Sequence, residues 1–258
     1  MKRFCFTVDD NIRCLRHLTE QRPASIFDIP YFGFYRRLHE QYGLKVQLNL
    51  FYEEGDFNLS LMTDAYRAEW EANADWLKLS FHSKSEWPAR PYEFSGYDEV
   101  FADCSAVHRE ILRFAGEKSL AKTTTVHYCR NTADGLRALR DCGVEGLLGL
   151  FGTAENPRTS YEVTEEHLPA IRRGETVVFR DVAMGSLDVI LNDCRPDVAH
   201  ARVEALLDRE NAHIMTHEQH YYPDRSGHSY EFEPKTEDAV ALLCKNGFAP
   251  AFFEEMMQ

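Results

Sequence analysis

Short β-favouring runs alternate with helical segments along this 258-residue chain, and the alternation limits its fold more than any other feature. The expected strands lie at 4–8, 44–51, 76–81, 122–128, 146–151, 176–179, 187–191, 212–216 and 249–253. The expected helices lie at 30–42, 62–73, 97–114, 132–142, 198–209 and 236–246. A strand, a helix and a strand in sequence form a parallel βαβ unit. Because no Pro-, Gly- or Ser-rich linker interrupts the pattern, it predicts one α/β domain over 1–258.

Seven or eight parallel strands close into a (β/α) barrel, whose active site lies at the carboxyl ends of the strands.

The net charge and the cysteine pattern indicate which partners the protein binds and in which compartment it works. Lys and Arg number 29 against 42 Asp and Glu, so the net charge of -13 argues against nucleic acid as a partner. Seven scattered cysteines without a CxxC pair predict reduced thiols in a cytoplasmic protein. No apolar stretch approaches the roughly 20 residues that cross a bilayer, so no membrane partner is expected.

Acidic and imidazole side chains follow three of the expected strands. Asp9 and Asp10 end the first strand, His82 follows the strand 76–81, and His217 follows the strand 212–216. Adjacent carboxylates cannot both be buried and ionised without a cation or strong donors, and a metal is one solution. The alternative for Asp9 and Asp10 is that one of them caps a following helix.

A hydrolytic metal site needs three ligands, an open position for water, a general base and a general acid. Glu86 lies four residues after His82, so in a helical turn the two side chains would share a face and could bind one ion. An exposed helix contact is the alternative for that pair. We therefore expect Asp10, His82 and Glu86 as metal ligands, Asp9 as the base and His217 as the acid. His213 lies lower on its strand and is expected to be structural.

These residues resemble the motifs of the NodB-type polysaccharide deacetylases, which are carbohydrate esterases of family four. Residues 7–11, Thr-Val-Asp-Asp-Asn, resemble the first motif, in which the first Asp is the base and the second binds the metal. Residues 82–86 resemble the second motif, normally His-Ser/Thr-x-x-His, and residues 214–217 resemble the last, which supplies the acid. The resemblance implies a distorted (β/α) barrel of about seven strands.

Two departures from the family pattern stand out. Glu86 occupies the place of the second metal-binding His, which makes the site more anionic. The resemblance implies one divalent metal ion, with zinc expected first and manganese, cobalt, nickel or magnesium as alternatives. The third motif, Arg-x-Pro-Tyr, is absent, and Val-His-Tyr-Cys-Arg at 126–130 stands in its region. His127, Arg130 or Arg180 with Asp181 are the candidates to replace its Arg.

Aromatic residues near the motifs suggest a wall on which a sugar ring could stack, although packing is the alternative reading for them. The expected substrate-binding residues are Tyr52, Trp87, Tyr92, His127 and Arg180. The expected function is a metal-dependent hydrolase that removes an acetyl group from an N- or O-acetylated sugar or glycan, with a small molecule or oligosaccharide as substrate. One alternative is a hydrolase of a small non-peptide amide on the same barrel. The other is a catalytically silent carbohydrate-binding protein.

Overall fold

The computed structural model describes residues 1–153, 158–222 and 231–257. Its larger sheet is parallel and has β1 (Arg3–Asn11) at the centre. On one side of β1 lie β2 (Val46–Phe51) and then β5 (Leu77–Ser83). On the other side lie β11 (Asn211–His217) and then β10 (Val189–Ile190). The short strand β12 (Ala249–Pro250) pairs with Arg3 and Phe4 at the start of β1, across from β11.

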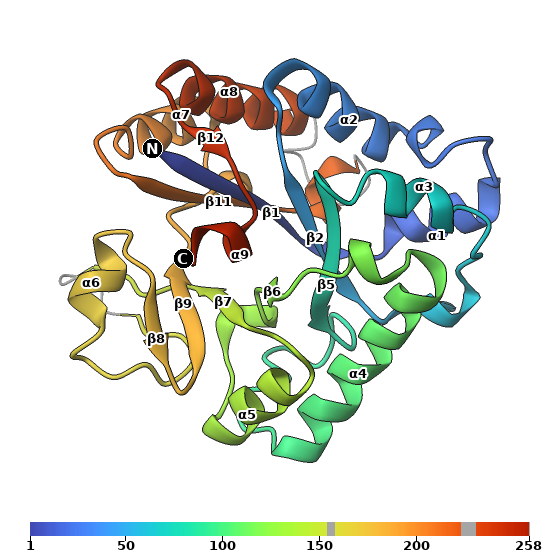
Figure 1. Cartoon of the computed structure of the whole chain (residues 1–258), viewed down its shortest axis with the longest axis horizontal. Coiled ribbons are helices and arrows are strands. Elements are labelled where there is room, and N and C mark those ends of the chain that lie inside the picture. Colours follow the sequence, from blue (N-terminus) through green and yellow to red (C-terminus); the bar gives the residue numbers. More distant parts are fainter. Residues whose placement is uncertain (154–157, 223–230, 258) are drawn as a thin grey trace.

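A second sheet faces the first (Figure 1). It runs from β6 (Thr123–Thr124) through β7 (Gly146–Gly149) and β9 (Val182–Ser186), all parallel, to the antiparallel edge strand β8 (Val177–Phe179). The sheets approach each other at both margins, where Ala121 N donates to Leu79 O at 2.9 Å and Asp188 N donates to His213 O at 2.9 Å. They therefore enclose one interior, which confirms the expected α/β fold with a parallel central sheet. A short hairpin of β3 (Glu53–Glu54) and β4 (Phe57–Asn58) lies apart.

The longer helices cover the outer faces of the sheets (Figure 1). The α-helices are α1 (Arg13–Gln21), α2 (Pro30–Tyr42), α3 (Arg67–Ala72), α4 (Tyr97–Phe114), α5 (Ala133–Asp141), α6 (Leu168–Arg172), α7 (Pro196–Glu204), α8 (Phe232–Lys245) and α9 (Phe253–Met256). The 3-10 turns are η1 (Ile26–Asp28), η2 (Leu59–Leu61), η3 (Glu117–Ser119), η4 (His127–Cys129), η5 (Leu191–Asp193) and η6 (Glu218–Tyr221). In the described ranges no helix is long and apolar enough to cross a membrane.

The C-terminal helix α9 fills part of the interior between the sheets (Figure 1). A Cβ atom on Gly185 of β9 would lie 2.8 Å from Phe253 Cζ, so only glycine leaves room for that ring. The Phe253 ring also packs edge-on against His213 of β11, with ring centroids 5.3 Å apart and ring planes at 83°. This packing fills the barrel below the carboxyl ends of the strands and leaves those ends for a site.

The strands expected at 122–128 and 249–253 are much shorter in the structure. The strand expected at 122–128 is limited to β6, because the chain turns into η4, where Tyr128 and Cys129 have φ of 61° and 54°. The strand expected at 249–253 ends at Pro250, because Phe252 N donates to Glu255 Oε2 at 2.8 Å and starts α9. Both changes bring side chains into the barrel interior, from the 3-10 turn η4 and from the helix α9.

Candidate functional site

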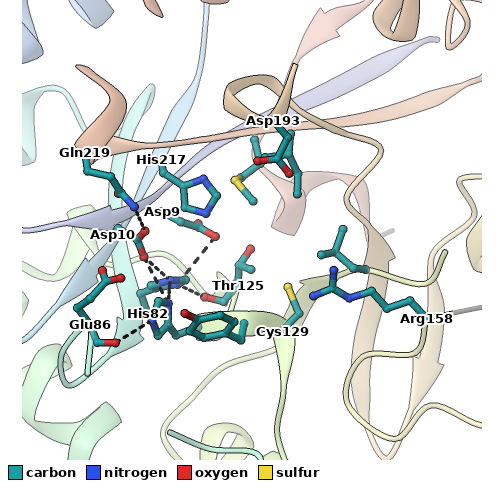
Figure 2. A pocket seen from close by; sticks show the side chains of 15 residues that line it. Asp9, Asp10, His82, Glu86, Thr125, Cys129, Arg158, Asp193, His217 and Gln219 are labelled. Atoms are coloured by element: carbon teal, nitrogen blue, oxygen red, sulfur yellow. Dashed lines mark hydrogen bonds and ion pairs between the residues drawn. The ribbon is translucent and has the colours of Figure 1, made fainter. Parts of the chain in front are cut away.

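A cavity of about 260 Å³ opens at the carboxyl ends of the strands (Figure 2). Asp9 and Asp10 of β1, His82 of β5, His127 of η4 and His217 of β11 all line it. These residues come from segments up to about two hundred positions apart, and the parallel arrangement gathers them at one end of the barrel.

Three of these side chains form a group that could hold a metal ion. One donor atom each of Asp10, His82 and His127 lies within 4.8 Å of the others, and all three residues are buried. His82 Nε2 is 3.0 Å from Asp10 Oδ1, and His127 Nδ1 is 3.4 Å from the same oxygen. The two imidazole nitrogens are 3.0 Å apart.

The hydrogen bonds around this group set which nitrogen of each neutral imidazole would carry the proton. His82 Nδ1 lies 2.5 Å from Thr125 O, and His127 Nε2 lies 3.4 Å from Glu86 O. A carbonyl oxygen only accepts, so in the neutral imidazoles these outer nitrogens carry the protons and the inner nitrogens present lone pairs to a metal ion that takes the place of a proton. Asp10 Oδ1, which both inner nitrogens face, is buried without an aligned hydrogen bond. Three converging lone pairs of nitrogen and oxygen fit a divalent cation.

The electrostatics of the site also favour a cation. Burial alone lowers the pKa of His82, but the nearby carboxylates, Asp9 foremost, outweigh burial and raise its pKa to about 9. Their negative charge therefore draws positive charge to this end of the barrel.

An irregularity in β1 lets two consecutive carboxylates reach the same cavity. Successive side chains of a regular strand point to opposite faces. The β1–β2 register shifts between Val8 and Asn11, and Asp10 has φ of 63°. Gln219 Nε2 then donates to Asp10 Oδ2 at 2.8 Å, which leaves Oδ1 for the metal group.

Asp9 is held by an amide rather than by an arginine. Asn49 Nδ2 of β2 donates to Asp9 Oδ1 at 2.6 Å, and Gln47 Nε2 donates to Asn49 Oδ1 at 2.8 Å. Burial raises the pKa of Asp9, although His82 and His217 work against it. A buried carboxylate of raised pKa has the character of a proton acceptor.

His217 is half-buried and lies at the end of β11, in register with Asp9 on β1. Its Nδ1 lies 2.7 Å from Asn192 Oδ1, so Nδ1 donates and orients the ring. Figure 2 shows the ring beside Asp9 at the cavity.

Comparisons with known proteins rest on structure. No family model matches the sequence, and no curated protein matches it. The structure is similar to a putative polysaccharide deacetylase from Mycobacterium smegmatis, with a TM-score of 0.60 and 10% identity over 99% of this chain and 89% of that one. A peptidoglycan N-acetylglucosamine deacetylase matches with a TM-score of 0.52 and 13% identity over 99% of this chain and 88% of that one. The chain has the fold of the NodB-type polysaccharide deacetylases.

A CE4 family pseudoenzyme from Bacillus anthracis has the same NodB-type fold. It matches with a TM-score of 0.53 and 10% identity, over 100% of this chain and 66% of that one. The fold therefore accommodates a protein described as a pseudoenzyme as well as deacetylases, and the function has to be argued from the site.

Within this NodB-type fold, Glu86 and His127 differ from their expected places. The helical turn expected after His82 is wrong, because β5 continues to Ser83 and Glu53 N donates to Lys84 O at 2.9 Å. Glu86 lines the cavity, but its side chain does not belong to the group of metal donors among the described residues. His127, expected to bind substrate, supplies the third donor atom of the group that could hold a metal ion.

The other expected substrate-binding residues do not line the cavity within the described chain. Tyr92 is fully buried and bonds Lys84 N at 2.9 Å and Asp103 Oδ2 at 3.1 Å, so it anchors a loop. Arg180 lies in the β8–β9 turn, before β9 begins, and hence at the opposite end of the barrel. Tyr52 packs against the core, whereas Trp87 is 70% exposed outside the cavity.

Several residues around the site were not expected from the sequence. The sequence does contain a signal for two of them. Gln47 and Asn49 lie within the apolar run 44–51, and a buried amide needs a hydrogen-bond partner, which indicates a polar neighbour inside the barrel. Arg158 lines the cavity across from Asp10 (Figure 2), and its loop carries no pattern that could have indicated this place.

Proposed function

We propose that this chain, as one catalytic domain over 1–258, is a metal-dependent hydrolase that removes an acetyl group from an N- or O-acetylated sugar. The observation that carries the proposal is the convergence of three donor atoms, from Asp10, His82 and His127, beside Asp9 and His217 in one cavity. Zinc suits two imidazoles and a carboxylate best. A bound divalent ion supplies Lewis-acid polarisation of the acyl carbonyl and stabilises negative charge at its oxygen.

The remaining residues supply the proton transfers. Asn49 holds Oδ1 of Asp9, so Oδ2 is the oxygen that takes the proton of the attacking water. His217 keeps its Nδ1 on Asn192, so Nε2 is the nitrogen that protonates the leaving amine or alcohol. Protonation is needed because an amide anion is too basic to leave.

The size of the cavity favours a small substrate unit. About 260 Å³ lies below the roughly 300–1,000 Å³ of sites for drug-sized ligands, so the described cavity accommodates about one sugar unit. Arg158 is the one Lys or Arg among the described lining residues, opposite several carboxylates. The same dimensions favour the second candidate, a hydrolase of a small non-peptide amide with the same metal and proton-transfer groups.

Metal binding tests the ligand set directly. We expect zinc to bind the purified apoprotein in calorimetric titration, and His127→Ala to weaken binding at least about 100-fold, since even outer-shell partners contribute 10–100-fold. Glu86→Gln is the matched control, because Glu86 lines the same cavity, and it should bind zinc like the wild type. Loss of binding in Glu86→Gln with retention in His127→Ala would refute the ligand set.

Acid release from a panel of substrates tests the reaction. The panel contains N-acetylglucosamine, chitooligosaccharides, O-acetylated sugars and small cyclic and linear amides. Acetate release by the zinc-loaded wild type, lost in His217→Asn without loss of zinc, supports the deacetylase. Release only from the small amides selects the second candidate, and zinc binding without any turnover refutes both.

A further inference from the structure

Two cysteines meet where α5 packs on α4, away from the candidate site. Cys142 follows the last residue of α5, and its Sγ lies 3.4 Å from Ser105 Oγ and 3.8 Å from Phe101 O, both on α4. Residues 101 and 105 are one helical turn apart. Cys104 directly precedes Ser105 on α4, and its Sγ lies 3.7 Å from His108 Nε2. Since Cys142 Sγ contacts Ser105, the neighbour of Cys104, the two thiols lie close enough to interact directly across the α4–α5 contact.

The two thiols differ in exposure and acidity. Cys142 is half-buried, whereas Cys104 is fully buried. The Cys104 thiol lowers the pKa of Cys142 to about 7, burial opposes this effect, and the Ser105 hydroxyl adds to it. Burial holds the pKa of Cys104 well above its ordinary value. At neutral pH the accessible sulfur is therefore the nucleophile, and the buried one stays protonated beside it.

We propose that Cys142 and Cys104 are a peroxide-reactive pair that oxidises to a disulfide joining α5 to α4. The Cys142 thiolate attacks hydrogen peroxide, the O–O bond breaks, and sulfenic acid and, after protonation, water result. The Cys104 thiol then attacks the sulfenic sulfur, losing its proton, and the hydroxyl leaves as a second water. Peroxide is the oxidant, and the two thiols lose two electrons in total.

The other half-buried cysteine supplies an internal control. Cys244 Sγ lies 3.7 Å from Tyr42 O, and burial raises the pKa of its thiol. It shares comparable exposure with Cys142 but lacks an acidifying thiol neighbour among the described residues. It should react slowly with electrophiles and peroxide.

The experiment uses the intact reduced protein. After treatment with hydrogen peroxide at pH 7, peptide mapping should find a Cys104–Cys142 disulfide, and iodoacetamide should label Cys142 of untreated protein at least about tenfold faster than Cys244. Cys104→Ser should accumulate a dimedone-reactive sulfenic acid at Cys142, whereas Cys244→Ser should behave like the wild type. Equal rates of iodoacetamide labelling at Cys142 and Cys244 would overturn the proposal, as would peroxide-treated wild type without a disulfide-linked Cys104–Cys142 peptide. Both measurements use the wild-type protein, so neither depends on the folding of a variant.

Discussion

Glu218 gives the sharpest test of how the fold positions the candidate site. It is fully buried directly after His217, and its carboxylate accepts hydrogen bonds from the backbone at the start of α1. Ile12 N and Arg13 N donate to Oε2 at 2.8 and 2.9 Å, and Cys14 N donates to Oε1 at 2.6 Å. Ile12 has no side-chain cap bond, so Glu218 caps this helix from the other end of the chain.

Replacing Glu218 by Ala leaves these three backbone donors without their acceptor. Each buried unpaired donor costs about 1–3 kcal/mol. Ile12 and Cys14 are buried, whereas Arg13 N is only partly buried and water can reach it. Counting the two buried donors in full predicts a loss of about 4 kcal/mol in the free energy of unfolding, a large share of the roughly 5–15 kcal/mol of an ordinary domain.

Urea unfolding at neutral pH measures this loss, and zinc titration measures its effect on the site. Because Gln219, the next residue, holds Asp10, we expect zinc affinity to fall about 10-fold as well. Glu254→Ala is the matched control: Glu254 also accepts a backbone bond, from Lys122 N at 2.7 Å, but it lies on α9 away from the cavity. A Glu218→Ala protein within about 0.5 kcal/mol of the wild type would refute the reasoning.

Three further predictions concern acid stability, packing and the proposed base. Burial lowers the pKa of His108 to about 4, whereas the pKa of an unfolded histidine is about 6.5. The folded state therefore keeps its full stability above pH 6.5, where the ring is neutral in both states. On acidification to pH 4.5 the unfolded chain takes up the proton first, and the free energy of unfolding falls by about 2.5 kcal/mol. Urea unfolding at pH 7.5 and 4.5 should show a smaller difference in His108→Leu, and an unchanged difference contradicts this assignment. Gly185→Ala should destabilise by about 1–3 kcal/mol in thermal unfolding through its contact with Phe253, and Phe253→Leu in the same chain should recover part of the loss. Asn49→Ala should lower kcat about 100-fold with little change in KM on any substrate that the protein hydrolyses, because Asp9 loses its orienting bond, and an unchanged kcat rules out that role.

Parallel strands explain why much of the site could be predicted from residue order. A strand that is buried on both faces reads as a continuous apolar run, and β1 and β11 show such runs. The polar residues that follow these runs must therefore lie at one end of the barrel. Asp9, Asp10, His82 and His217 were singled out in this way, and the structure brings them to one cavity.

The third donor of the metal group could not be found by the same reasoning. His127 lies in η4 rather than at the end of a long strand, and two residues with positive φ direct the chain there. Glu86 was chosen instead because its spacing fits a helical turn, but the ladder with β2 keeps the chain extended through Ser83. Local spacing predicts shared faces only when the local conformation is known.

The sequence by itself determined the alternation of elements, the parallel sheet and the end of the barrel that carries the chemistry, because these follow from periodicity and burial along single segments. Only the tertiary structure decided that His127 joins Asp10 and His82, that Asn49 holds Asp9, and that Arg180 lies at the far end. Those outcomes depend on contacts between segments far apart in the chain. Hydrogen-bond direction and strand direction set such contacts, and neither can be read from one segment alone.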